Sequence, residues 1–204
     1  MSWVVLDVGG VLVDEARVWR GWAELVGLPE AEFLAALERG IAAGQGIGGT
    51  VRALRPGLDI ATHRRRLAAL EIPTETDLYP DVRPAFAALR AAGLRIGIAG
   101  NQPEGVAEAL TALDLGADFV ATSAQWGVSK PAPAFFARVI AATGVEPGRI
   151  AYVGDRLDND AEPAAAAGLR PIFVPRGLWG RLHAGWARGV IRIESLMELP
   201  ACCA

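Results

Sequence analysis

The sequence predicts an α/β fold in which a doubly wound parallel sheet carries an inserted, all-helical segment. The first observation behind this prediction is a series of short apolar runs, each followed by a polar or glycine-rich loop, which is the pattern of buried parallel strands. The second is that helix-like stretches separate these runs, because alternating strands and helices favour right-handed crossovers. The predicted strands cover residues 4–6, 94–99, 119–121, 150–153 and 172–174, with residues 190–193 as a candidate sixth.

Four helices are predicted between these strands. Residues 82–92 carry Pro84 in the first turn and are followed by Gly93, at the position where a helix ends. The other three helices are expected at residues 103–113, 131–143 and 158–167.

Residues 15–77 break the alternation of strands and helices. Apolar residues such as Trp19 and Trp22 recur there at helical spacing, and no run has the pattern of a strand. Aromatic residues at this spacing belong to a core more often than to a pocket. The glycines of residues 44–49 predict a flexible connection, and residues 60–70 predict a further helix. We therefore expect two domains, a core of residues 1–14 and 78–204 and a helical domain of residues 15–77.

Composition excludes several classes of function. The chain has 204 residues, is 52% hydrophobic and has a formal net charge of −3, which gives no broad positive field for nucleic acid. No apolar run is long enough to span a bilayer, and the N-terminus lacks the pattern of a signal peptide. The only cysteines, Cys202 and Cys203, are adjacent and cannot form a disulfide framework, which favours a reducing cytoplasm. Monomer and homodimer remain open.

Residues suited to chemistry follow the predicted strands. In an open parallel sheet, ligands bind outside the carboxyl ends of the strands, near the point where the strand order reverses. The candidate residues in these loops, in chain order, are Asp7, Gly9 and Gly10; Gly100 and Asn101; Lys130, at the start of a helix; and Asp155, Asn159 and Asp160.

Three of these residues suit phosphoryl transfer. Asp7, at a strand end beside two glycines, can present its carboxylate for in-line attack on phosphorus and form an aspartyl-phosphate. A dianionic substrate would repel that carboxylate, and Mg²⁺, which prefers oxygen ligands, would relieve the repulsion with Asp7 and Asp155 as ligands. Lys130 offers a compact positive charge to Asp7 and to the transferring phosphoryl group. Backbone N–H groups around Asn101 and in the loop after Asp7 are candidates to hold the phosphate oxygens.

This set of loops resembles the motif set of the haloacid dehalogenase (HAD) superfamily of hydrolases. The resemblance covers nearly the whole chain, including a helical insertion where that family has its C1-type cap and the return to the core at residues 78–82. It implies a HAD-like core, Mg²⁺ as cofactor, and hydrolysis of a small phosphorylated metabolite, with Gly10 and Gly100 in the substrate-binding loops. It also implies that the backbone carbonyl of Gly9 is a third metal ligand.

The resemblance further implies that Asn159 and Asp160 are candidates to support the metal ligands without binding the metal themselves. Capping of the following helix is an equal alternative for both residues.

Two positions depart from the family pattern. Gly9 stands where the phosphatases of the family usually carry a second aspartate, which protonates the leaving group and later activates water; such a loss typically costs about 10²–10⁴-fold in rate. Gly100 stands where the family has a Ser or Thr that binds phosphate. Because of these departures, two alternative functions stay open. Under these alternatives, the protein is either a catalytically silent relative that binds a metabolite or a protein partner, or a dehalogenase-like hydrolase. The helical insertion argues against a phosphoacceptor receiver domain.

Lys130 is the only lysine among the 20 lysine and arginine residues. A coding bias toward arginine explains the other cations, and the exception falls where the chemistry needs a point charge rather than a guanidinium fork. The lack of a second lysine excludes the phosphonatase branch of the family, which forms a Schiff base with a cap lysine. We expect Lys130→Arg to fold normally and to lose most of its activity. His183 has no carboxylate or nucleophile near it in sequence, and we assign it no catalytic role.

Overall fold

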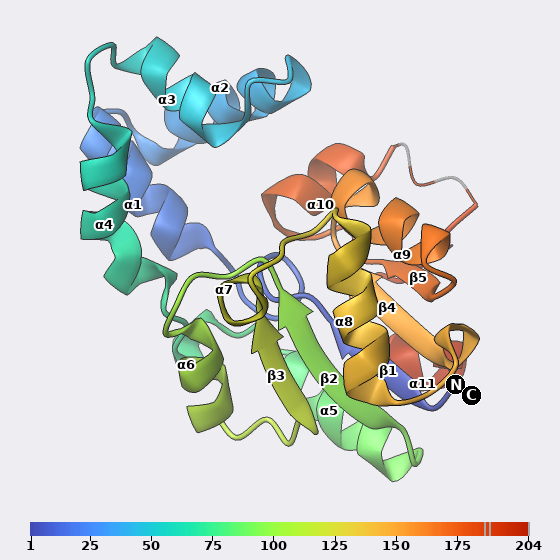
Figure 1. The fold of residues 1–204 in the computed structure, drawn as a ribbon. Helices are drawn as coiled ribbons and strands as arrows, with labels where there is room; N and C mark the ends of the chain where they lie inside the picture. Colours follow the sequence, from blue (N-terminus) through green and yellow to red (C-terminus); the bar gives the residue numbers. More distant parts are fainter. Residues whose placement is uncertain (186, 188, 204) are drawn as a thin grey trace. The chain divides into compact units, whose positions relative to one another are not determined.

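The computed structural model describes residues 1–185, 187 and 189–203, without the side chains of residues 64–66. Its centre is a six-stranded sheet in the order β3-β2-β1-β4-β5-β6, and all pairs are parallel (Figure 1). The doubly wound parallel sheet is therefore confirmed, with the candidate sixth strand as a short edge. The strands are β1 (Trp3–Leu6), β2 (Arg95–Gly100), β3 (Phe119–Thr122), β4 (Ile150–Gly154), β5 (Arg170–Phe173) and β6 (Ile191–Arg192).

The central strand, β1, is buried between its two neighbours. Its residues are at most 2% exposed, as expected for an apolar strand inside a parallel sheet. It pairs with β2 on one side and with β4 on the other, so that Leu6 is aligned with Ile98 and with Val153. The strand order reverses at β1, and the loops that follow β1, β2 and β4 meet at one edge of the sheet.

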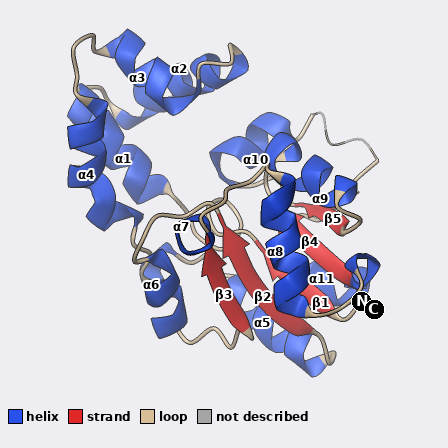
Figure 2. Cartoon of the chain, viewed as in Figure 1, coloured by secondary structure: helices blue, strands red, loops and turns tan. Residues whose placement is uncertain are grey.

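Helices cover both faces of the sheet (Figure 2). On one face, Phe135 and Phe136 of α8 join a buried cluster with Trp3 and Tyr152 of the strands. The opposite face carries α5 and α11. The helices of this part of the chain are α5 (Val82–Ala91), α6 (Val106–Ala112), α7 (Ser123–Trp126), α8 (Pro133–Thr143), α9 (Glu162–Ala166), α10 (Gly177–His183) and α11 (Leu199–Cys203), with short turns η1 (Glu75–Asp77), η2 (Pro147–Arg149), η3 (Leu157–Ala161) and η4 (Leu196–Glu198).

Two predicted helices differ in their bounds. The helix expected at residues 103–113 begins only at Val106, because Gly105 has a φ of 86°, a left-handed conformation that does not continue into a helix. The helix expected at residues 158–167 is divided into the π-helical turn η3 and the short α9.

The inserted segment is all-helical, and two of its helices approach closely at a glycine. A Cβ on Gly40 of α2 would collide with the side chain of Thr50, so that α2 and α3 approach closely. The flexible connection predicted at residues 44–49 is wrong, since α3 begins at Gly46. Burial of Thr50 and Val51 stabilises this helix despite its glycines. Trp19 and Trp22 are 6% and 3% exposed. The helices are α1 (Ala16–Val26), α2 (Glu30–Ala42), α3 (Gly46–Leu54) and α4 (Ile60–Glu71).

The chain divides into two compact units, one of Met1–Asp14 with Pro73–Ala204 and one of Glu15–Ile72. The helical unit thus ends at Ile72 rather than at residue 77. Residues 73–77 belong with the sheet because the carbonyl of Asp77 accepts the N–H of Asp14 at 2.8 Å. Val13 and Leu78 form an antiparallel bridge beside this hydrogen bond.

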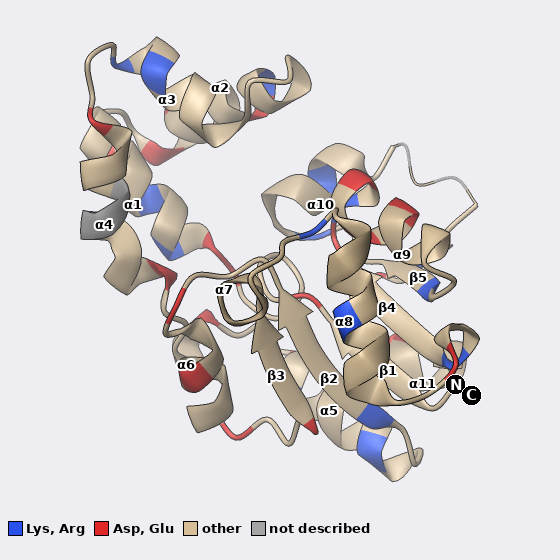
Figure 3. Cartoon of the chain, viewed as in Figure 1, with Lys and Arg blue, Asp and Glu red and all other residues tan. Residues whose placement is uncertain are grey.

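The two ends of the chain lie side by side (Figure 1), because the amino group of Met1 donates to the carbonyl of Cys203 at 2.9 Å. Neither Cys202 nor Cys203 is in a disulfide, and burial raises the pKa of the Cys203 thiol to about 11. In the described part of the chain, basic and acidic residues are interspersed over the elements (Figure 3). Among these residues, no helix combines the length and the apolar character needed to cross a membrane.

Candidate active site

Asp7 is the first residue after β1 and lies at the carboxyl edge of the sheet. Its N–H donates to the carbonyl of Val153 at 2.9 Å, which continues the pairing of β1 with β4 and fixes the backbone. Asp7 is 7% exposed, and its Oδ1 lies 2.8 Å from Nζ of Lys130. A rigid strand end therefore presents this carboxylate to a single ammonium group.

Lys130 lies between two carboxylates. Its Nζ is 2.8 Å from Oδ1 of Asp7 and 2.6 Å from Oδ1 of Asp160, and the centres of the Phe135 and Tyr152 rings are 5.9 Å and 5.6 Å away. Burial lowers the pKa of Lys130, but the charges of Asp160 and Asp7 outweigh burial and hold that pKa well above its usual value. The side chain is therefore a permanently charged ammonium.

Asn101 fixes the backbone of Lys130. Its Oδ1 accepts the N–H of Lys130 at 2.8 Å, and its Nδ2 donates to the carbonyl of Lys130 at 2.9 Å. The side-chain amide predicted beside the phosphate is thus engaged with Lys130. The Nδ2 group has a second N–H, so the side chain of Asn101 and the backbone around it both stay candidates for a phosphate contact.

Asp160 holds Lys130 from the side opposite Asp7. It is 1% exposed, its Oδ1 accepts from Nζ of Lys130, and its Oδ2 accepts the N–H of Arg156 at 3.0 Å. Burial raises the pKa of the Asp160 carboxyl to about 6; the charge of Asp7 adds to this shift and the ammonium of Lys130 opposes it. Because each of its oxygens accepts a hydrogen bond, Asp160 is suited to hold the Lys130 ammonium in place. Asn159 is half-buried, and its side chain forms no hydrogen bond within the described part of the chain.

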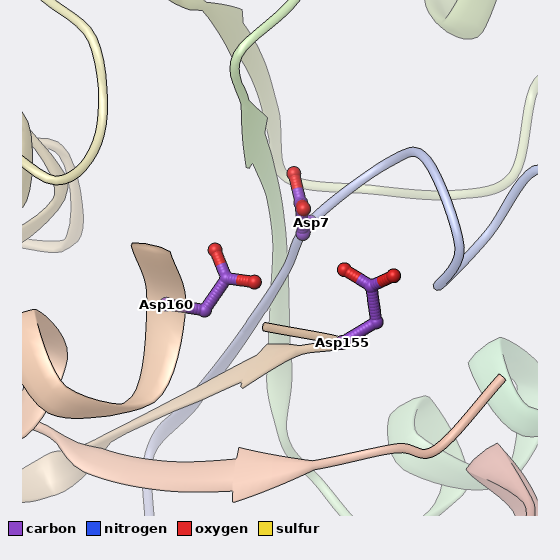
Figure 4. A group of neighbouring side chains, drawn as sticks. All are labelled: Asp7, Asp155 and Asp160. Atoms are coloured by element: carbon purple, nitrogen blue, oxygen red, sulfur yellow. The ribbon is translucent and has the colours of Figure 1, made fainter. Parts of the chain in front are cut away.

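Three carboxylates form a group that could hold a metal ion. Asp7, Asp155 and Asp160 each bring one oxygen to within 4.8 Å of the others, and all three residues are buried. Figure 4 shows the side chains turned toward a common space at the ends of β1 and β4. Closely spaced, buried carboxylates repel one another, and their hard oxygen atoms suit Mg²⁺. The donor set therefore fits the predicted cation.

A glycine makes room for each of the three carboxylates. At each of these glycines, an added Cβ would collide with the neighbouring carboxylate, so any side chain there would displace it. The pairs are Gly100 with Asp7, Gly10 with Asp155, and Gly154 with Asp160. Gly10 and Gly100, which the sequence predicted to lie in substrate-binding loops, thus make room for two of these carboxylates.

The loop after Asp7 is tight. The carbonyl of Val8 accepts the N–H groups of Leu12 and Val13 at 2.8 Å and 2.9 Å, and Gly9 forms a bridge with Val13. The N–H of Gly10 donates to the carbonyl of Val13 at 2.9 Å, so this amide is already engaged. Position 9 offers a backbone carbonyl and no acid–base side chain.

One further residue near this edge, Arg176, was not predicted from the sequence, and His183 was assigned no catalytic role. Arg176, in the loop after β5, forms an ion pair with Asp81 at 2.7 Å. His183 of α10 accepts the N–H of Leu157 through Nδ1 at 2.9 Å. Arg176 lies in a loop after a predicted strand, a position that indicates a candidate residue, whereas nothing in the local sequence connects His183 with Leu157.

Comparisons with known proteins identify the family of this chain. A model of the haloacid dehalogenase-like hydrolase family matches residues 1–168, and the protein belongs to that family. A phosphoserine phosphatase from Thermus thermophilus is 36% identical over 104 residues, 50% of this chain and 42% of that protein. A glyceraldehyde 3-phosphate phosphatase from Methanopyrus kandleri is 37% identical over 105 residues, 48% of this chain and 44% of that protein. The matched region spans less than half the length of these two relatives.

The fold is also shared with a solved structure over the whole chain. YfnB from Bacillus subtilis, described as a HAD hydrolase and crystallised with magnesium, superposes with a TM-score of 0.74 at 18% identity, covering 99% of this chain and 98% of that one. At this identity the likeness concerns the fold, and it confirms the predicted α/β class.

Proposed function

We propose that the protein is a Mg²⁺-dependent phosphatase that hydrolyses a small phosphorylated metabolite through a phosphoenzyme on Asp7. One observation carries the proposal. The Asp7 carboxylate at its rigid strand end contacts the buried ammonium of Lys130 at 2.8 Å, and one of its oxygens lies within 4.8 Å of one oxygen each of Asp155 and Asp160. Membership of the hydrolase family and the phosphatase names of two relatives support the proposal.

The reaction would begin with attack of an Asp7 carboxylate oxygen on phosphorus. The new bond joins Asp7 to phosphorus, the bond to the ester oxygen breaks, and the leaving alkoxide takes up a proton from water. Lys130, held in place by Asp160, stabilises the negative charge that gathers on the phosphoryl oxygens. Water then attacks the phosphorus of the aspartyl-phosphate, which releases inorganic phosphate and restores the Asp7 carboxylate.

The residues at the strand ends would hold Mg²⁺. Asp7 and Asp155 would bind it through their carboxylates, and Gly9 through its backbone carbonyl, as the family resemblance implies. When bound, Mg²⁺ supplies positive charge that reduces the repulsion between Asp7 and a dianionic phosphate. The helical unit, Glu15–Ile72, would serve as the cap that selects the substrate.

The glycine at position 9 bears on the class of substrate. Without an acidic side chain there, nothing at that position protonates the leaving alkoxide, a contribution worth about 10²–10⁴-fold in other enzymes. Esters whose leaving group is stable as an anion need such an acid least. We therefore expect the rate to rise steeply as the pKa of the leaving group falls, from alkyl esters to aryl esters and acyl phosphates.

A panel of phosphate monoesters and acyl phosphates, assayed for released phosphate with and without Mg²⁺, tests the function. We expect wild type to hydrolyse at least one of them only with Mg²⁺, and Asp7→Asn to be inactive. Asp118→Asn is the matched control, because Asp118 pairs with Arg95 at 3.2 Å just before β3, at the opposite edge of the sheet. It should keep wild-type activity.

Three results would overturn the proposal. Hydrolysis that survives in Asp7→Asn would show that Asp7 is not the nucleophile. No hydrolysis of any ester by wild type would favour a catalytically silent member of the family that binds a metabolite or a protein partner. Release of halide from haloacids, with the esters untouched, would favour a dehalogenase-like hydrolase instead.

The place of action that we propose is the cytoplasm. Small phosphorylated metabolites are found there, and two adjacent cysteines do not form the disulfide frameworks of secreted proteins.

A further inference from the structure

The guanidinium of Arg176 joins three separate segments of the chain. From the loop after β5, its Nη1 donates to both oxygens of Asp81, at 2.7 Å and 2.9 Å. Its Nη2 donates to the carbonyl of Val11. Its carbon Cζ lies 4.2 Å from the centre of the Tyr79 ring. A planar fork can make all of these contacts at once, whereas a lysine ammonium cannot.

The Val11 carbonyl belongs to the tight loop of residues 8–13 that follows Asp7. Gly10, immediately before Val11, lies so close to Asp155 that a Cβ on it would collide with that carboxylate. The residue after Arg176 touches the same loop, because a Cβ on Gly177 would come within 2.8 Å of Cα of Gly10. Arg176 thus holds the loop at Val11, and Gly177 approaches it closely at the adjacent Gly10, beside one of the carboxylates.

Asp81 in turn fixes the guanidinium. Its Oδ2 also accepts from Oγ of Ser195 and from the N–H of Leu196, both at 2.9 Å. Burial raises the pKa of Asp81, but the hydrogen bonds from Arg176, Leu196 and Ser195 outweigh burial and hold that pKa below its usual value. The anchor of Arg176 is therefore an ionised carboxylate that three chain segments share.

We propose that Arg176 is a positioning residue for the divalent cation. By holding the Val11 carbonyl, it sets the path of the loop and thereby the place of the Gly9 carbonyl and the contact of Gly10 with Asp155. Arg176 acts through this loop rather than by contact with the cation. The inference rests on the proposed function, because it requires a cation held by Asp7, Gly9 and Asp155.

Calorimetric titration of the full chain with Mg²⁺ alone, without substrate, tests this role. Arg176→Lys keeps a positive charge beside Asp81 and loses the fork that also reaches Val11. We expect its affinity for Mg²⁺ to fall roughly 10-fold, the lower end of the effect of residues that orient metal ligands. In the phosphatase assay, the Mg²⁺ concentration for half-maximal rate should rise by the same factor, while KM for the ester at saturating Mg²⁺ stays unchanged.

Arg83→Lys is the matched control. Arg83 also bonds a carboxylate, that of Glu75 at 2.7 Å and 2.6 Å, and a backbone carbonyl, that of Leu113 at 2.8 Å, but it lies on the surface. Its replacement should leave the affinity for Mg²⁺ at the wild-type value. Circular dichroism melting of both variants reports the stability that each has lost.

Wild-type affinity for Mg²⁺ in a folded Arg176→Lys variant would overturn the inference. Should that variant fail to fold, Asp81→Asn provides the test, because loss of the Asp81 charge loosens the guanidinium; it should weaken Mg²⁺ binding by a smaller factor, and unchanged affinity would again contradict the inference. A wild type that binds no Mg²⁺ would overturn the proposed function itself, so the two failures are distinguishable.

Discussion

Oδ1 of Asp7 lies in the space that a Cβ at position 100 would occupy. Gly100, the last residue of β2, thus permits the direction in which Asp7 points, toward Nζ of Lys130 at 2.8 Å. In the family that this chain resembles, a Ser or Thr stands at this position and binds phosphate. In this protein, any side chain at position 100 would force the Asp7 carboxylate to turn away from Lys130. The direction of Asp7 therefore requires glycine at position 100.

Gly100→Ala should therefore lower kcat/KM by roughly 10²-fold, the cost of a misplacement of about 1 Å in a reacting group. Gly100→Ser should not raise activity, although it restores the hydroxyl of the family pattern. The control is Gly148→Ala, because a Cβ on Gly148 has no neighbour within 4 Å. Rates are compared on the ester that wild type hydrolyses best. Full activity in Gly100→Ala would show that Asp7 reacts from another direction.

Lys130→Arg should lose stability as well as activity. The Lys130 residue is 4% exposed, and its Nζ is enclosed by two carboxylates and the rings of Phe135 and Tyr152. A guanidinium is larger, and overpacking of a buried site typically costs about 1–3 kcal/mol. The packing thus argues against the sequence-based expectation of normal folding. Urea unfolding measures the loss, and a wild-type midpoint would restore that expectation.

Asp81→Asn should reduce the free energy of unfolding by roughly 2 kcal/mol near neutral pH, the value of hydrogen bonds to a charged group. The pKa of Asp81 is lowered from 3.8 in the folded protein. The charge of Asp81 therefore stabilises the fold at pH values above the ordinary pKa of 3.8. This stabilisation is lost as the pH falls through the folded-state pKa. The difference between variant and wild type should shrink in acid.

The matched control for Asp81→Asn is Glu194→Gln, which removes one partner of the ion pair with Arg192 at 2.8 Å; the Glu194 side chain is 71% exposed. Its effect should stay within about 0.5 kcal/mol at every pH. Urea unfolding across the pH range compares both variants with wild type. An Asp81→Asn effect that is independent of pH would show that the Asp81 charge does not stabilise the fold.

His183→Asn should make stability less sensitive to mild acid. Burial lowers the pKa of His183 from 6.5, and its Nδ1 accepts the N–H of Leu157. Because the unfolded chain binds the proton more readily, the stabilisation by neutral His183 is complete above pH 6.5 and is lost as the pH falls through the folded-state pKa. Asn offers an acceptor oxygen that does not titrate. Wild type should lose stability relative to the variant as the pH falls below 6.5; a stability difference between the two proteins that does not change with pH would refute this prediction.

The fold was largely predictable because buried parallel strands carry a local signature. Strands β1 to β5 each contain a short apolar run, whereas the edge strand β6, Ile191–Arg192, is exposed. The residues that follow the strands were predicted to meet at one edge. The glycine-rich start of α3, Gly46–Leu54, had no such signature. Glycine opposes a helix in an isolated peptide, and contact of Thr50 with Gly40 of another helix decides the outcome.

The candidate site was predictable to the extent that it depends on strand ends. Position alone indicated Asp7, Asp155 and Lys130. The direction of a side chain depends on residues distant in sequence, so the two interpretations of Asp160 could not be separated. In the structure one oxygen of Asp160 accepts a backbone N–H while the other accepts from Lys130.

The role of Arg176 could not be predicted from the sequence for the same reason. It donates to the carbonyl of Val11, 165 residues away in sequence, and no local pattern encodes that contact.

Phosphoryl attachment to Asp7 in the presence of Mg²⁺ is the central claim, and fluorine NMR with beryllofluoride, which mimics a phosphoryl group on aspartate, tests it without knowledge of the substrate. We predict a protein-bound beryllofluoride signal in wild type that requires Mg²⁺, persists in Asp118→Asn and is lost in Asp7→Asn. A wild type that gives no bound signal with Mg²⁺, or an Asp7→Asn variant that keeps it, would contradict the account.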